Sequence, residues 1–225
     1  GDGNRRRTGQ QEGQHDLRHG GMVLPGKGLQ GGVTHQAPAQ LPGLRQRAVG
    51  HDRDLMLLHQ PFGDTYGAWR ALEELYKEGK LHAIGISNHY TDRMVEFANF
   101  TNIKPMVNQI LLHISNTPME LVEYCQKNSI VVEAYSPIAH GEILNQPEIT
   151  TIAKKYGVTV PQLCIRYTLQ LGAISLPKTG NPEHMKSNAQ LDFQISAEDM
   201  ELLKNFKKIK SYGDSGIFPV YGGKM

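Results

Sequence analysis

Short apolar runs alternate with amphipathic stretches between residues 54 and 210. The apolar runs have the length of buried strands, and they lie at 55–58, 82–86, 106–110, 130–134 and 174–176. Between and after them, apolar residues recur at helical spacing, which predicts helices at about 68–76, 91–100, 118–127, 147–156, 161–171, 182–189 and 197–208. The pattern therefore predicts a series of strand–helix units from residue 54 onward.

Residues that favour helix ends stand at the predicted boundaries. Glycine follows three of the helices, as expected for C-terminal caps, at Gly79, Gly157 and Gly172. Thr91 is a candidate N-cap, and Thr117-Pro118-Met119-Glu120 fits a capping box with proline at the first helical position. Asn181-Pro182 and Ser196 are predicted to start the last two helices.

The regular repeat of these units predicts the fold class. Strand centres recur roughly every 25 residues until a longer last interval, and units of that size build a parallel sheet. No G-x-G-x-x-G loop follows any strand, which disfavours a dinucleotide-binding Rossmann fold. We predict an α/β TIM (β/α)8 barrel that is incomplete, because a barrel needs eight strands and the pattern supplies five.

Residues 1–53 differ in composition from the rest of the chain. They contain no Ile, Phe, Tyr, Trp, Ser or Cys, but half of the 24 glycines and seven of the ten arginines. With so little apolar surface to bury, the segment cannot offset its ordering entropy. We predict three parts: a non-family, disordered or frame-shifted segment at 1–53, the barrel portion at 54–210, and a loop tail at 211–225.

Charge and hydropathy argue against two kinds of partner. A net charge of +2 gives no electrostatic case for nucleic acid, and Arg5-Arg6-Arg7 is better explained as part of a solvated tail. No run approaches the ~20 apolar residues that span a bilayer, and the N-terminus lacks an apolar signal-peptide core. Cys125 and Cys164 fall in predicted helices and are expected to be reduced core thiols. These features predict a cytoplasmic protein with no nucleic-acid or membrane partner, and they leave the oligomeric state unknown.

Polar or aromatic residues stand at or near the end of every predicted strand. They are His59, Ser87-Asn88, Asn108-Gln109, Tyr135-Ser136 and Lys178-Thr179. In a TIM barrel such strand ends form the active face. Each residue also has a plain structural explanation, because Ser, Asn and Thr favour turns, a lone His after an apolar run is often a core residue, and Tyr135 could simply pack. Five ends in register favour a functional face, and Gln60 beside His59 is predicted to face a substrate.

The last of these strand ends has the features of a phosphate site. Lys178-Thr179 precede Gly180-Asn181-Pro182-Glu183, a loop that leads into a helix. Backbone N–H groups and the helix dipole attract phosphate at such a position, and a lysine adds a positive charge. The alternative is a solvated lysine beside an ordinary helix start.

Four stretches carry longer motifs. They are DLMLLHQPFGDTYGAWRALEELYKEGKLHAIGISNH (54–89), PMVNQ (105–109), VVEAYSPIAHG (131–141) and ISLPKTGNPEHMKSN (174–188). Together they resemble the aldo-keto reductase family over about 54–210. The resemblance implies a (β/α)8 barrel that uses NADPH, less often NADH, to reduce small aldehydes and ketones to alcohols by hydride transfer. The sequence around Tyr66–Trp69 and Tyr135–Gly141 is most similar to that of microbial and protozoal diketogluconate reductases and prostaglandin F synthases.

The resemblance implies a role for each residue around the reacting carbon. His59 looks like the histidine that orients and polarises the substrate carbonyl. Ser87, Asn88 and Gln109 look like the residues that bind the nicotinamide carboxamide, and Tyr135 looks like the aromatic residue on which that ring stacks.

The remaining implied roles concern the rest of the cofactor. Ser136 and Ile138 line up with residues near the pyrophosphate. Lys178 and Thr179 look like the pair that holds the ribose 2′-phosphate, and Asn188 looks like an adenine contact.

Some positions depart from the family pattern. His184 stands where an arginine commonly clamps the 2′-phosphate, and a neutral histidine cannot do so in a bidentate way, which weakens the expected preference for NADPH. Ser187 replaces a frequent glutamate near the adenine. Leu111 and Ile114 stand where the family usually has Glu and Pro.

The larger departure concerns the general acid. Family catalysis depends on a Tyr that protonates the alkoxide, with a Lys and an Asp that lower its pKa, but no Tyr precedes Tyr66.

We interpret residues 1–53 as a frame-shifted or mis-annotated translation of the missing strand–helix units. A sheet of five strands would have open edges near 55–58 and 174–177. Three functions stay open: a carbonyl reductase of doubtful activity, an inactive nucleotide-binding remnant, or a structural fragment.

Overall fold

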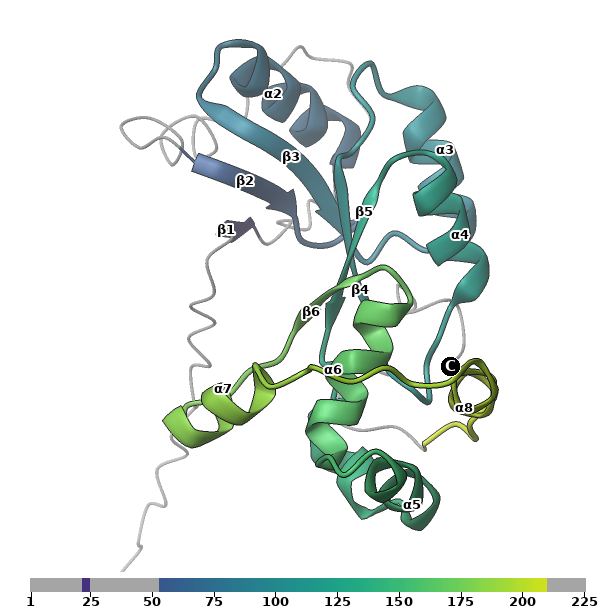
Figure 1. The fold of residues 1–225 in the computed structure, drawn as a ribbon. Helices are drawn as coiled ribbons and strands as arrows, with labels where there is room; N and C mark the ends of the chain where they lie inside the picture. Colours follow the sequence, from purple (N-terminus) through teal and green to yellow (C-terminus); the bar gives the residue numbers. More distant parts are fainter. Residues whose placement is uncertain (1–21, 25–52, 210–225) are drawn as a thin grey trace, which may run out of the picture.

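One parallel sheet runs through the part of the chain that the structure describes. The computed structural model describes residues 22–24 and 53–209 of the 225-residue chain. Six strands follow one another in chain order across the sheet (Figure 1). They are Met22–Leu24 (β1), Arg53–Leu58 (β2), Leu81–Ser87 (β3), Val107–Leu111 (β4), Val131–Tyr135 (β5) and Ile174–Leu176 (β6).

The five predicted strands are confirmed, with small shifts at their ends. β1 was not predicted, and the expectation of an open edge at 55–58 is wrong because β1 pairs with β2 through Val23 and Leu57. Of the segment 1–53, which we predict to be disordered, the structure describes only β1 and Arg53, the first residue of β2. The rest of that segment and the predicted tail at 211–225 lie outside the described residues.

The predicted helices are also confirmed. They are Thr65–Lys77 (α2), Thr91–Phe100 (α3), Met119–Lys127 (α4), Pro147–Lys155 (α5), Val160–Gln170 (α6), Pro182–Asn188 (α7) and Ala197–Lys204 (α8). The last helix ends earlier than predicted, with Asn205 as its C-cap. A short 3₁₀ segment at Ala139–Asn145 (η1) was not predicted. None of the described helices is long and apolar enough to cross a membrane.

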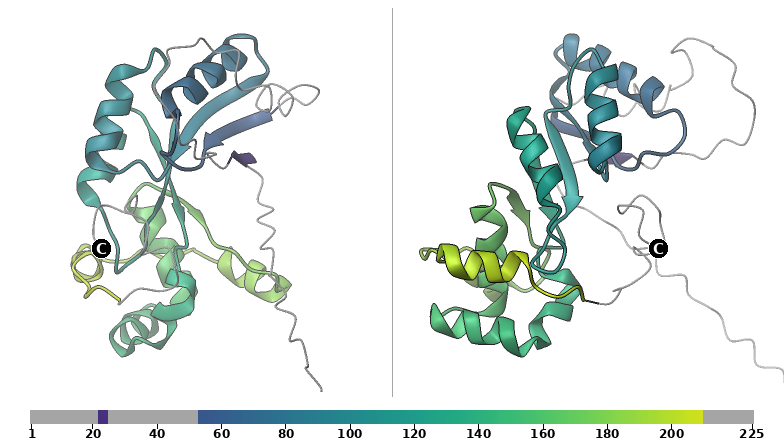
Figure 2. Two further views of the ribbon diagram at one scale, coloured as in Figure 1. Left: turned by 180° about the vertical axis from the view of Figure 1, so that it is seen from behind. Right: turned by 90° about the vertical axis from the view of Figure 1, so that its right-hand side faces the viewer.

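The winding of the chain places the helices on one side of the sheet. Parallel strands in sequential order, joined by right-handed crossovers, put every connection on the same face. Figures 1 and 2 show α2, α3, α4 and α6 following the strands in this way, while the strand direction turns between β2 and β5. The result is an arc of a parallel barrel with its helices outside.

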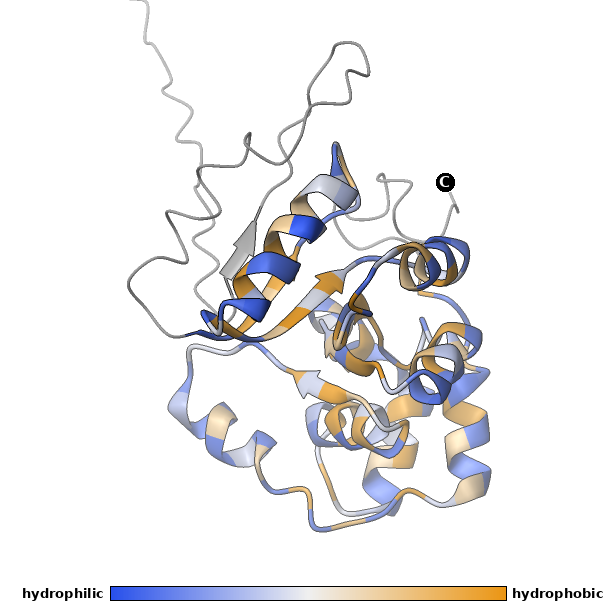
Figure 3. Cartoon of the chain, turned by 90° about the horizontal axis from the view of Figure 1, so that it is seen from above, coloured by the Kyte–Doolittle hydropathy of each residue, from blue (hydrophilic) through white to orange (hydrophobic). Residues whose placement is uncertain are grey.

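The core lies between the sheet and these helices. Strand register places Met56 beside Ile84, and Ile110 beside Ala134, on the face that the helices cover, and all four side chains are fully buried. Figure 3 shows the apolar sides of the helices turned towards the strands. The opposite face is more open, since Val131 is 42% and Ile174 48% exposed. Cys125 and Cys164 are buried and without a disulfide, as predicted.

Two of the predicted N-terminal helix caps are wrong and two are confirmed. Asn181 and Ser196 accept the expected bonds, from Glu183 N and Asp199 N. Thr91 is the first helical residue and makes no cap, because Tyr90 occupies the N-cap position. The predicted capping box at 117–120 does not form. Its hydroxyl, from Thr117, bonds instead to the carbonyl of His113 and to the Tyr167 hydroxyl, so a tertiary contact replaces the local one.

Gly79, Gly157 and Gly172 do end helices in the left-handed region, with φ of +71°, +66° and +80°. This conformation carries little penalty for glycine because it has no Cβ.

Candidate active site

Polar groups on β3, β4 and β5 form a continuous row near the carboxyl edge of the sheet, with Gln109 and Glu133 two residues before the ends of β4 and β5. Strand register places Ser87 beside Gln109, and Gln109 beside Glu133. Tyr135 follows two residues after Glu133 and therefore points to the same face of the sheet. This is the carboxyl edge of a parallel sheet, the expected place for chemistry in an α/β protein.

Asn88 links four strand ends. Its amide nitrogen donates to the His59 carbonyl at 3.1 Å and to Ser87 Oγ at 3.2 Å, and its Oδ1 accepts from the Tyr135 hydroxyl at 3.0 Å. Its backbone N–H donates to the Gln109 carbonyl. Asn88 adopts φ +58°, a conformation that asparagine tolerates better than most residues. Only 2% of the residue is exposed, so both amide hydrogens serve to hold the site together.

Ser87 and Gln109 are fixed by their neighbours in the sheet. Ser87 is buried and donates from its hydroxyl to the Gln109 carbonyl at 2.8 Å. Gln109 Nε2 donates to Glu133 Oε2 at 2.7 Å. Glu133 is not among the predicted site residues, although a carboxylate inside an otherwise apolar strand is a signal that could have found it.

A second residue that the sequence analysis missed supports the end of β3. His89 is 2% exposed, and its ring packs edge-on against Phe97. Burial lowers its pKa to about 4, so the ring is neutral at pH 7. Its Nδ1 lies 3.0 Å from the Ser87 carbonyl, which can only accept, so Nδ1 carries the proton.

His59 and Gln60 lie together just after β2. Burial lowers the pKa of His59, which favours a neutral ring that can donate one hydrogen bond. Gln60 Oε1 is buried without a hydrogen-bond partner among the described residues. An unpaired buried acceptor is costly, and it suits a group that receives a donor from a bound molecule.

The loop after β5 has an unusual backbone. Ser136, Ala139 and His140 adopt φ of +51°, +47° and +53°, in a region that non-glycine residues rarely occupy. Ser136 Oγ lies 2.8 Å from His140 Nε2, and Ile138 stands at the N-cap of η1. Such strain is typical of loops whose shape is imposed by a functional requirement.

Lys178, Thr179 and Asn188 lie apart from the group around Asn88. Lys178 and Thr179 precede α7 and Asn188 is its last residue, and α7 stands to one side of the sheet beyond β6 (Figure 1). Thr179 Oγ1 accepts from Asn181 N at 3.1 Å, and Lys178 is exposed. The end of α7 is held by Gln162, which donates to the carbonyls of Ser187 and Gln190. The predicted site residues therefore form two groups along one edge.

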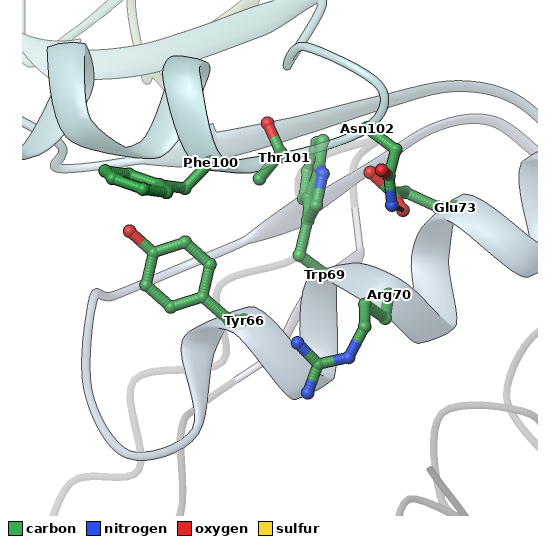
Figure 4. Close-up of a pocket in the computed structure, with 7 residues that line it drawn as sticks. All are labelled: Tyr66, Trp69, Arg70, Glu73, Phe100, Thr101 and Asn102. Carbon is green, nitrogen blue, oxygen red and sulfur yellow. Dashed lines mark hydrogen bonds between the residues drawn. The ribbon is translucent and has the colours of Figure 1, made fainter. Parts of the chain in front are cut away.

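A cleft of about 100 Å³ lies elsewhere, between α2 and the end of α3 (Figure 4). The buried Glu73 accepts from Ile103 N at 2.8 Å and from Asn102 Nδ2 at 3.3 Å, and Trp69 Nε1 donates to the Ile103 carbonyl. These polar groups of the cleft bond to one another, so we interpret it as a structural joint. Among the described residues no cluster of three or more metal-ligating side chains occurs.

Sequence comparison identifies the family. The profile of the "Aldo/keto reductase family" matches residues 32–208, more than half of the chain. The chain belongs to the aldo/keto reductase family. The match begins at residue 32, inside the segment that the composition set apart.

Curated relatives of this aldo/keto reductase cover most of the described part. An uncharacterized oxidoreductase of Schizosaccharomyces pombe is 44% identical over 156 residues, which are 68% of this chain and 56% of that protein. The glyoxal reductase of Bacillus subtilis is 40% identical over 162 residues, 71% of this chain and 59% of that protein. The chain thus spans somewhat more than half the length of these relatives.

Solved structures share the architecture. An aldo-keto reductase of the silkworm Bombyx mori superposes with a TM-score of 0.69 at 33% identity, covering 76% of this chain and 60% of that one. The same silkworm enzyme complexed with NADPH gives a TM-score of 0.65 at 34% identity, over 71% of this chain and 56% of that one. The arc of strands is therefore part of an aldo/keto reductase barrel, as predicted.

A Tyr, a Lys and an Asp do meet in the described part, but not at the strand ends. Asp199, at α8, accepts from Lys155 at 2.8 Å and from the Tyr156 hydroxyl, both at the end of α5. Lys155 and the Tyr156 hydrogen bond hold the pKa of Asp199 below its usual range. The tyrosine proton is committed to Asp199, and Ser196 N donates to the same hydroxyl oxygen. This trio joins two outer helices and is structural.

Proposed function

We propose that this chain is an NADP(H)-dependent oxidoreductase that reduces small aldehydes and ketones to alcohols. The interlocked strand ends around Asn88 carry the proposal, because they align a flat aromatic ring with amide groups on one face. Two structural relatives support the cofactor, since one was solved in complex with NADPH and the other in complex with NADP.

The residues around Asn88 fit a nicotinamide. Tyr135 offers a ring whose hydroxyl is anchored to Asn88 Oδ1, which suits stacking of a planar ligand. Gln109 keeps its Oε1 acceptor and one amide hydrogen after bonding to Glu133. When bound, NADPH would supply the hydride. Ser87 and Asn88 would act mainly by holding Gln109 and Tyr135 in place.

His59 would orient the substrate carbonyl. Its lowered pKa favours the neutral imidazole, which can donate one hydrogen bond to a carbonyl oxygen without leaving an unpaired buried charge. The unpartnered Oε1 of Gln60 would accept a hydrogen bond from a substrate hydroxyl or amide. These two side chains would set the position of the substrate beside the ring.

The loop after β5 and the residues around α7 would hold the remainder of the cofactor. Ser136 and Ile138 belong to the strained loop after β5, near which a pyrophosphate would lie. The exposed ammonium of Lys178, with Thr179, would meet the 2′-phosphate, and Asn188 would contact adenine. His184 is exposed on α7 and cannot form a bidentate clamp, so NADH remains a possible cofactor.

The main alternative is a nucleotide-binding protein without turnover. The described residues bring no Tyr–Lys–Asp set to the strand ends, and loss of a general acid costs about 10²- to 10⁴-fold in rate. We keep the proposal that residues 1–53 are a frame-shifted or mis-annotated translation of the missing strand–helix units, of which residues 32–53 still match the family. Peptides spanning residues 40–70, found by mass spectrometry of the native protein, would contradict it.

Fluorescence titration with NADPH, followed by a turnover assay with a simple aldehyde, tests the proposed function. Trp69 is the only tryptophan, and the cofactor supplies a second signal. We expect saturable binding, weakened by Gln109→Ala and unchanged by Gln126→Ala, a glutamine that caps the end of α6 through the Leu171 carbonyl. Binding with turnover supports the reductase, and binding without turnover supports the remnant. Absence of binding contradicts both.

A further inference from the structure

Glu133 faces Gln109 from the neighbouring strand. The two residues are direct partners in the parallel register of β4 and β5, and the carboxylate accepts from the amide at 2.7 Å. Both residues are half-buried. The pair lies in the same row as Ser87, the last residue of β3, and two residues before the ends of β4 and β5.

This contact fixes which way the Gln109 amide points. An ionised carboxylate can only accept, so it must meet the NH₂ group and not the carbonyl. The backbone of Gln109 is already held from β3, since its carbonyl accepts from Ser87 Oγ and from Asn88 N. With Glu133 on the β5 side, the amide Oε1 has to point away from that strand.

We propose that Glu133 is a positioning residue that presents the Oε1 of Gln109 to the NH₂ of a nicotinamide carboxamide. The inference rests on the proposed function, because it requires a nicotinamide at this edge. Asn88 cannot replace Gln109 as the adjustable group, because its amide hydrogens and its oxygen already bond to His59, Ser87 and Tyr135. Gln109 is the amide of this site whose orientation depends on one carboxylate.

The alternative is a cross-strand hydrogen bond with a purely structural purpose. Such a pair contributes little to stability, and a neutral partner would serve equally well. A structural role would change the binding of every nicotinamide ligand by the same factor. A positioning role changes only the discrimination between ligands that have the carboxamide NH₂ and those that lack it.

The test uses two cofactors and four variants of the full chain. NADPH is compared with its 3-acetylpyridine analogue, in which a methyl group replaces the NH₂, and the ratio of the two dissociation constants is measured. We expect the wild type to favour NADPH by about three- to tenfold, the value of one neutral hydrogen bond. Gln109→Leu should reduce the ratio to about one. Glu133→Gln and Glu133→Leu should reduce it at least threefold.

Glu123→Gln is the matched control. It removes one carboxylate from the exposed face of α4, where Glu123 Oε2 lies 4.0 Å from Lys127 Nζ. This substitution should leave the ratio of dissociation constants at the wild-type value. Because both cofactors are measured on one protein sample, partial unfolding of a variant cancels in the ratio.

Each outcome decides between the two proposals. A wild-type protein that binds neither cofactor contradicts the proposed function, and the role of Glu133 fails with it. A wild type that discriminates, together with Glu133 variants that keep the ratio or weaken both ligands equally, overturns the positioning role and leaves the proposed function intact. A ratio lost in the Glu133 and Gln109 variants, and kept in Glu123→Gln, supports it.

Discussion

Single residues at the strand ends are buried or half-buried and bond to partners from other strands as well as to their neighbours in sequence. His89 shows what this costs, because its ring is neutral and buried while an unfolded histidine has a pKa near 6.5. Burial lowers the pKa of His113 to about 4 as well. Between those values the unfolded chain binds more protons than the native one, so folding stability must fall as the pH is lowered from about 6.5 to 4.

We therefore expect the free energy of unfolding, measured with urea at several pH values, to decrease steadily over that range. His89→Asn keeps a donor for the Ser87 carbonyl and removes one titrating group, so it should flatten the dependence. His184→Asn, on the exposed surface of α7, should leave it unchanged. A slope that His89→Asn does not alter would show that His89 is not buried as a neutral ring.

The sequence could predict those site residues that a local pattern marks, but not those that depend on a partner from another strand. The places of His59, Ser87, Gln109 and Tyr135 in or just after the parallel strands could be predicted because each belongs to or follows an apolar run. Glu133 was missed because its partner, Gln109, lies 24 positions earlier on another strand, and the only local sign of the pair is a carboxylate inside an apolar strand.

At the scale of elements, α2 is tied to the loop between α3 and β4 by a buried carboxylate. Glu73 is 3% exposed and accepts from the backbone N–H of Ile103 and the side chain of Asn102. Hydrophobic periodicity predicted both helices but not this joint, because Glu73 lies on the buried face of α2, where the pattern leads one to expect an apolar residue. The predicted cap at Thr117 failed for a similar reason: the hydroxyl found a tertiary partner.

Two substitutions of Glu73 should separate the contribution of its negative charge to stability from that of its hydrogen-bonding shape. Glu73→Ala leaves the Ile103 N–H unpaired and is expected to lower the free energy of unfolding by about 2–4 kcal/mol. Glu73→Gln keeps an acceptor and should lose about half as much. Glu74→Ala on the same helix serves as a comparison, since Glu74 is only partly buried. Urea denaturation measures all three, and equal losses for Glu73→Ala and Glu74→Ala would refute a special role for the joint.

At the scale of the molecule, the described residues form an arc of strands with helices on its outer face, and exposure of the inner face shows whether that arc is closed. In a closed barrel, side chains on that face are packed in layers. Here Ile174, on the edge strand β6, remains 48% exposed, and Val131 on β5 remains 42% exposed. Apolar groups in that position favour association between copies of a chain.

If the inner face is open in solution, Ile174→Thr should change the free energy of unfolding by less than about 0.5 kcal/mol, as for other surface substitutions. It should also reduce concentration-dependent association, measured by light scattering. Leu202→Thr, at a residue of α8 that is 57% exposed, controls for the loss of surface apolar area away from the sheet. A loss of about 1–3 kcal/mol for Ile174→Thr alone would mean that another part of the protein covers this face. The inner face of the barrel would then be packed, and the proposed nicotinamide site would be enclosed.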